Sequence, residues 1–121
     1  MAYVDGFLLP VPKKNLRTYR AISRKAGKIW RQHGALEYRE CVGDDLKAKP
    51  GMGVPFPRTA KVRNGETVVF SWIVYKSRAD RDRVNKKVMK DPRLLKMMAG
   101  SPCPFDVKRM NYGGFKVLVE A

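Results

Sequence analysis

The chain has 121 residues, of which 44% are hydrophobic and 31% are charged, and its 26 Lys and Arg against 11 Asp and Glu give a formal net charge of +15. This length fits one packed domain over residues 1–121, and the composition excludes general disorder. A charge of this size attracts polyanions, but it bears on nonspecific partners and not on the fold.

No stretch of the sequence suits a membrane or a secretion signal. The longest apolar runs, such as residues 72–75, are far shorter than the ~20 residues needed to cross a bilayer. Residues 1–10 lack the basic leader, apolar run and cleavage site of a signal peptide. We therefore expect a cytoplasmic protein with no membrane partner, whose Cys41 and Cys103 stay reduced and act as small, partly buried hydrophobic residues.

The first predicted element is a strand over residues 3–11, which are apolar and extended in character. We expect it to end at Pro10 and Pro12, because proline cannot continue a central ladder. Within the strand, Asp5-Gly6 predicts a bulge or a close backbone contact.

A helix and a second strand follow. Residues 13–33 predict a helix, because apolar residues recur at spacings of three and four along one stripe. Gly34 is placed to end the helix. Residues 36–42 alternate in the manner of a strand with one more polar side. Residues 43–58, rich in Pro and Gly, predict a long irregular loop that is mobile or involved in binding.

The strongest strand signal covers residues 66–75, which are apolar on both sides. Ser77 and Asp80 predict the start of a second helix, which runs to about residue 90, where Pro92 marks a break. Three further elements complete the prediction: a short helical turn ending near Gly100, a connector over 101–106, and a strand over 110–119 with a bulge or tight approach at Gly113-Gly114.

This β-α-β, loop, β-α-β order predicts an α+β fold of the ferredoxin-like βαββαβ type, with an antiparallel sheet and helices on one face. The segment 66–75 would then leave an apolar face in water. Packing two sheets face to face as a dimeric α+β barrel covers that face, since burial of apolar area stabilises by roughly 25 cal/mol per Å². We therefore predict a homodimer.

Several runs carry a family resemblance: Tyr3–Phe7, Gly34–Leu36 leading to Glu40–Cys41, Val68–Ile73, Asp91–Arg93, and the closing segment from Pro104 through Arg109 to Phe115. They resemble the YbaA-like family of uncharacterised bacterial proteins over nearly the whole chain. The resemblance implies membership of the dimeric α+β barrel superfamily and implies no catalytic residues. The chain departs from the family pattern at Cys103, Val107 and Asn111, and relatives can be acidic, so the positive charge is not a family property.

The first functional hypothesis is a small-molecule site, enzymatic or only binding, between the sheet and the helices. Asp5 and Glu40 interrupt apolar strands, and a desolvated carboxyl group can act as an acid or base. The alternative is that such an acid faces solvent or pairs with a cation such as Arg109. His33 could instead cap its helix, and Trp72 could belong to the core. The candidate residues are Asp5, His33, Tyr38, Glu40, Trp72, Arg109 and Tyr112.

The second hypothesis is binding of RNA or another polyanion through basic outer helices, against the alternative of a merely solvated basic face. A third is a structural or interaction role without any ligand. The sequence has no common nucleotide or metal motif, so we expect no cofactor and no metal. The candidate residues for the polyanion are Arg17, Arg20, Arg24, Lys28, Arg31, Arg78 and Arg81.

Overall fold

The computed structural model describes residues 1–100 and 102–121. Its strands are β1 (Tyr3–Pro12), β2 (Glu37–Val42), β3 (Glu66–Tyr75) and β4 (Asn111–Lys116). Its α-helices are α1 (Leu16–His33), α2 (Phe56–Thr59), α3 (Arg78–Met89) and α4 (Pro92–Gly100), and short 3-10 turns cover Lys13–Asn15 and Val107–Arg109.

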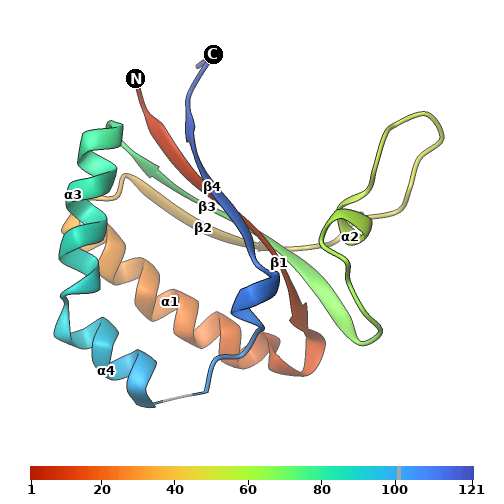
Figure 1. Ribbon diagram of the computed structural model, residues 1–121, viewed down its shortest axis with the longest axis horizontal. Helices are drawn as coiled ribbons and strands as arrows, with labels where there is room; N and C mark the ends of the chain where they lie inside the picture. Colours follow the sequence, from red (N-terminus) through yellow and green to blue (C-terminus); the bar gives the residue numbers. More distant parts are fainter. Residues whose placement is uncertain (101) are drawn as a thin grey trace.

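The four strands form one sheet in the order β2-β3-β1-β4, and every neighbouring pair is antiparallel. Helices α1, α3 and α4 gather on one side of this sheet, while α2 lies apart from them near the other end of the strands (Figure 1). This is the predicted ferredoxin-like α+β arrangement, and the fold prediction is confirmed.

Strand alternation gives the sheet two distinct faces. The face toward the helices, here called the helix face, carries Leu9 and Val11 of β1 and Val69, Ile73 and Tyr75 of β3, all of them buried. The opposite face, here called the open face, carries the alternate residues. The long strand β3 is therefore apolar on both sides, as its sequence predicts.

The hydrophobic core lies between the helix face and the helices, in two neighbouring clusters. One cluster packs Ile29 of α1 and Val84 of α3 against Tyr75, and the other packs Tyr19 of α1 against Leu9. The apolar stripe of α1 supplies both contacts, because residues three and four apart share one side of a helix.

The structure corrects the prediction that the prolines interrupt the ladder of β1. The strand runs on to Pro12, and Pro10 pairs in register with Val68 on β3. On its other side β1 pairs with β4 only from Tyr3 to Leu8. Pro10 therefore has a strand neighbour on one side alone, and a proline is tolerated at such a position because no second ladder needs its missing N–H.

The predicted bulges are absent from β1 and β4. Their register is one-to-one through Gly6, Gly113 and Gly114. The alternative prediction of a tight approach holds at Gly114, where a Cβ atom would collide with the ring and hydroxyl of Tyr3. The glycine there makes room for a buried side chain and does not bend the strand.

The remaining boundaries follow local rules. The Ser77 hydroxyl accepts a hydrogen bond from the Asp80 amide at 3.1 Å, which confirms the predicted N-cap of α3. The helical segment breaks before Pro92, as predicted, and the segment 102–106 is a connector, whereas residue 101 lies outside the described residues. Two predictions change: the 43–58 loop includes α2, and the last strand ends at Lys116.

In the part of the chain that the structure describes, no helix combines the length and apolarity needed to span a membrane.

Candidate functional site

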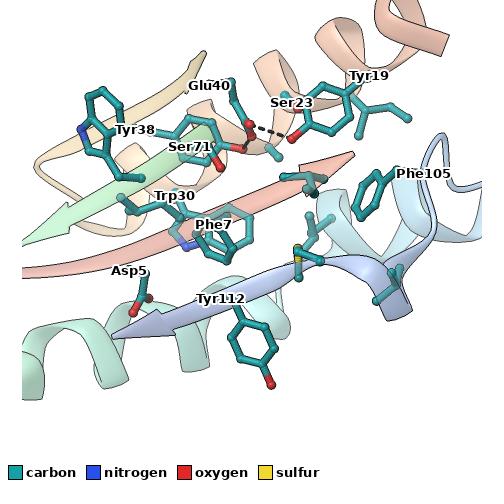
Figure 2. A pocket seen from close by; sticks show the side chains of 18 of the residues that line it. Asp5, Phe7, Tyr19, Ser23, Trp30, Tyr38, Glu40, Ser71, Phe105 and Tyr112 are labelled. Atoms are coloured by element: carbon teal, nitrogen blue, oxygen red, sulfur yellow. Dashed lines mark hydrogen bonds between the residues drawn. The ribbon is translucent and has the colours of Figure 1, made fainter. Parts of the chain in front are cut away.

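A cavity of about 690 Å³ lies between the helix face of the sheet and the helices. Its wall is mainly apolar and aromatic, and it is bordered by all four strands, by α1, α3 and α4, and by the connector before β4. Side chains from these elements converge on it in Figure 2. Prominent among the lining residues are Phe7, Leu9, Ile22, Ala26, Trp30, Ile73, Leu94, Met97, Phe105 and Met110.

One polar cluster at the cavity wall is built around Asp5. The carboxylate accepts a hydrogen bond from Arg81 on α3 at 2.9 Å, and Asp5 is only 7% exposed. Burial raises the pKa of Asp5 above its ordinary value, although Arg81 acts in the opposite direction. Beside this pair, the Asn85 side-chain oxygen accepts hydrogen bonds from Trp30 at 3.1 Å and Tyr75 at 3.0 Å.

A second polar cluster is built around Glu40 on β2. The phenol of Tyr19 on α1 donates to one carboxylate oxygen at 2.7 Å, and the phenol of Tyr38 donates to the other at 2.9 Å. Figure 2 shows the two rings meeting at Glu40 from different elements. Burial and the Glu40 charge raise the pKa of both phenols, so each stays protonated and remains a donor.

Gly27 of α1 makes the Glu40 cluster possible. A Cβ atom at this position would lie 2.7 Å from Cδ1 and 2.9 Å from Cε1 of Tyr38. Only a residue without a side chain lets the helix pass this close to the ring. The ring then lies where its hydroxyl reaches Glu40.

The structure brings together three of the seven residues predicted for a small-molecule site, Asp5, Tyr38 and Glu40, which all line the cavity. Tyr112 lies at its rim with 76% of its surface exposed, and its ring points away from Phe7 in Figure 2. Trp72 borders the cavity, but its indole donates to Glu37 at 3.2 Å on the open face.

The other two predicted site residues contact acidic side chains elsewhere. His33 contacts Asp91 at 2.7 Å and is not among the cavity residues, in agreement with a structural role at the helix end. Arg109 pairs with Glu66 through two hydrogen bonds of 2.6 and 2.9 Å. The alternative that a carboxylate in a strand pairs with a cation holds for Asp5, but the cation is Arg81 and not Arg109.

Sequence reasoning missed several cavity residues, chiefly Tyr19, Trp30, Tyr75 and Asn85. Tyr19 and Trp30 lie on the apolar stripe of the first predicted helix and Tyr75 lies on an apolar strand, which suggested core packing only. One signal was available for Asn85, since it is an uncharged polar residue in a predicted helix whose other residues from 78 to 90 are charged or apolar. A neutral amide in that place has to find partners inside the protein.

The predicted polyanion set is divided by the structure. Arg20, Arg24, Lys28 and Arg31 border a groove between α1 and β2, which we call the basic groove. Arg17 and Arg78 are exposed but do not border it. Arg81 does not fit the predicted surface role, because its guanidinium pairs with Asp5 and Asp82 and lies 4.9 Å from the centre of the Tyr3 ring.

Among the described residues, no group of three or more His, Cys, Asp or Glu side chains is arranged to hold a metal ion. Cys41 is half-buried on β2, whereas Cys103 is exposed, contrary to its predicted partial burial. The groups that offer chemistry are thus two carboxyl groups, four phenols and two guanidinium groups around an apolar space. They can accept or donate hydrogen bonds and exchange protons with a bound molecule.

Solved structures with a similar fold share little sequence with this chain. Rv0793 from Mycobacterium tuberculosis aligns with a TM-score of 0.59 at 16% identity, covering 100% of this chain and 99% of that one. A mutant of SnoaB, a cofactor-independent oxygenase from Streptomyces nogalater, aligns at 0.58 and 11%, covering 98% and 95%. A dimeric ferredoxin-like protein from an uncultured marine organism aligns at 0.54 and 12%, covering both chains fully. These similarities show the fold alone.

Sequence comparison adds the family. The uncharacterised protein YbaA of Escherichia coli K12 is 41% identical over 120 residues, which cover 99% of each chain, and its counterpart in Shigella flexneri matches to the same extent. The model of a family described as a protein of unknown function (DUF1428) matches residues 2–107. The resemblance noted from sequence is confirmed, and this chain belongs to the DUF1428 family together with YbaA.

Proposed function

We propose that the protein binds a small, largely apolar molecule in the cavity between sheet and helices, without a bound cofactor, and can exchange a proton with it. The observation that carries this proposal is the combination of a cavity of about 690 Å³ with the carboxyl groups of Asp5 and Glu40 in its wall. Apolar pockets with a few fixed polar groups are the usual form of small-molecule sites.

The polar groups favour a ligand that donates hydrogen bonds. Asp5 and Glu40 are hydrogen-bond acceptors when they are ionised. Arg81 also lines the cavity, but its charge is already balanced by the carboxylate of Asp5. A ligand hydroxyl or amine could give its hydrogen bond to either carboxylate. Burial raises the pKa of Asp5, which favours transfer of a proton from the ligand to this carboxylate, and the electron pair of the broken bond stays on the ligand.

A matched pair of tryptophan variants tests this proposal. Met97 lines the cavity, whereas Met52 is 74% exposed on the 43–58 loop. A thermal-shift screen of small aromatic and aliphatic compounds would first select those that raise the melting temperature of the wild type. We expect Met97→Trp to weaken their binding by at least about tenfold, and Met52→Trp to leave it unchanged. Equal binding by the two variants would place the ligand outside the cavity.

We also propose that the chain forms a homodimer through the open face. Phe70 is 42% exposed and Phe115 is 61% exposed on this face, and Phe56 of α2, 48% exposed, contacts the Phe70 ring at 5.6 Å between centroids. Exposed aromatic rings on one face of a sheet favour association in water. A neighbour of the same fold is described as dimeric, which supports a dimeric state.

A second candidate function is polyanion binding along α1. The observation that favours it is the basic groove, since four cations of one helix border a single concave surface. A negatively charged chain lying in this groove would meet these cations in succession and release counterions. Titration with labelled RNA at low and moderate salt tests whether this polyanion is a nucleic acid, and the absence of binding at low salt would exclude RNA.

A further inference from the structure

The basic groove has a volume of about 1000 Å³ and runs between α1 and the outer edge of the sheet. Its cations from α1 follow at spacings of four, four and three residues, which puts them along one flank of the helix. Arg39 of β2 also borders it. The cationic residues of the groove are Arg20, Arg24, Lys28, Arg31 and Arg39.

Positive charge dominates this surface. Its two acids are Glu37, which pairs with Arg39 at 2.6 Å, and Glu40, which accepts from two phenols. Within the described chain, Arg20, Arg24 and Lys28 form no ion pair. Three cations of the groove are therefore free to meet charges from outside the molecule.

The other wall of the groove is an unpaired strand edge. Strand β2 is the outermost strand of the sheet and pairs with β3 alone. In an antiparallel edge strand, alternate backbone N–H and C=O groups point outward and can pair with another extended chain. Leu36 and Val42, at the two ends of β2, are 53% and 56% exposed. The edge thus offers backbone hydrogen bonds between two apolar contacts.

We propose that the basic groove binds an extended acidic peptide segment of a partner protein, which adds to β2 as a fifth antiparallel or parallel strand. This inference rests on the second candidate function and names its partner class. A strand added at the usual spacing of about 4.8 Å would lie beside β2 and beneath the cations of α1. Charge complementarity and the free strand edge then act on the same ligand.

The groove fits a peptide better than RNA. Single-stranded nucleic acids usually stack their bases on accessible aromatic rings. The aromatic residues of the groove are Tyr19 and Tyr38, and both have their hydroxyls bound to Glu40. Tyr19 is only 8% exposed, which leaves little ring surface for a base. A nucleic acid would also leave the hydrogen-bonding groups of the β2 edge without matching partners.

Strand addition also sets the pattern of the ligand. Successive side chains of a strand point to opposite faces. One set of ligand side chains would face the cations of α1, and the other set would face the same way as Phe70 and Trp72. We therefore expect acidic and apolar residues to alternate in the bound segment.

The test uses a fluorescent peptide of alternating Glu and Val, measured by anisotropy at about 0.15 M salt, where long-range attraction is screened. A second version carries N-methyl groups on alternate residues along one edge, and a third carries them along the other edge. We expect the unmodified peptide to bind, and one of the two methylated versions to lose at least about tenfold in affinity. Equal binding of all three peptides would overturn strand addition, because charge alone would then explain the affinity.

Two double variants locate the site. Arg24→Glu with Lys28→Glu alters the groove, whereas Lys25→Glu with Lys87→Glu makes the same change of charge at exposed positions outside it. We expect only the first to weaken peptide binding by at least about tenfold. Equal effects would overturn the site. Binding of RNA but not of the peptide would overturn the inference and retain polyanion binding, whereas binding of neither would exclude both.

Discussion

Gly27 provides a sharp test of how the cavity wall is built. The residue lies in the middle of α1, and a methyl group there would come within 2.7 Å of the Tyr38 ring. This distance is much shorter than an ordinary van der Waals contact. The ring cannot easily move away, because its hydroxyl is hydrogen-bonded to Glu40 at 2.9 Å. Gly27→Ala must therefore shift either the helix or the ring.

The size of the effect follows from two opposed contributions. Replacing glycine by alanine inside a helix normally favours folding by up to about 1 kcal/mol. Overpacking costs about 1–3 kcal/mol, and a lost Tyr38–Glu40 hydrogen bond costs about 1 kcal/mol more. We expect Gly27→Ala to lower the free energy of unfolding by about 1–3 kcal/mol in all.

Gly100 supplies the matched control. It lies at the end of α4, and a Cβ atom there would meet nothing within 4 Å. Gly100→Ala should therefore be neutral or stabilising by up to about 1 kcal/mol. Urea denaturation of both variants measures the difference. If Gly27→Ala proves as stable as Gly100→Ala, the close contact of α1 with Tyr38 does not exist and the described Glu40 cluster is wrong.

Three other substitutions test the ion pairs and the open face. Arg81→Met leaves the buried Asp5 without its cation, so we expect urea denaturation at neutral pH to show a loss of about 2–4 kcal/mol, partly recovered when Asp5→Asn is added. The pKa of Glu66 is lowered from 4.5 to about 2, chiefly by the hydrogen bond from its arginine partner. Its stabilising contribution is thus complete above pH 4.5 and is lost as the pH falls toward 2, and Glu66→Gln should flatten the dependence of stability on pH over that interval. Phe70→Glu on the open face should convert a dimer to a monomer in sedimentation velocity, with Leu95→Glu on α4 as the control.

The sequence was a good guide wherever one local pattern decides the structure. Alternation marked the strands, a stripe at helical spacing marked α1, and Ser77 marked the start of α3. These signals depend on residues within a few positions of each other, which is the range over which backbone periodicity acts. The two-sided apolar character of β3 also followed directly from its sequence.

The composition of the site was harder to predict, because it depends on distant contacts. Asp5 and Arg81 are 76 positions apart, and nothing local distinguishes Arg81 from its basic neighbours on α3. The orientation of α3 about its own axis decides which of its arginines faces Asp5. Pro10 shows the same limit, since whether a proline lies inside a complete ladder depends on where the neighbouring strand ends.

The cavity and the basic groove share a wall, which decides how the two proposed functions can be separated. Tyr19, Tyr38 and Glu40 border both spaces. A substitution in this wall would disturb both ligands and could not assign either. Met97 borders only the cavity, and Arg24 borders only the groove.

Met97→Trp should therefore weaken only the binding of the small molecule, and the Arg24→Glu, Lys28→Glu variant should weaken only the binding of the peptide. The shared wall adds one requirement. If one ligand moves a tyrosine away from Glu40 and so changes the affinity of the other, thermodynamic linkage demands the same factor when the order of binding is reversed. Titrating each ligand in the absence and presence of the other measures this factor, and a factor of one would show that the two spaces do not act on each other through Glu40.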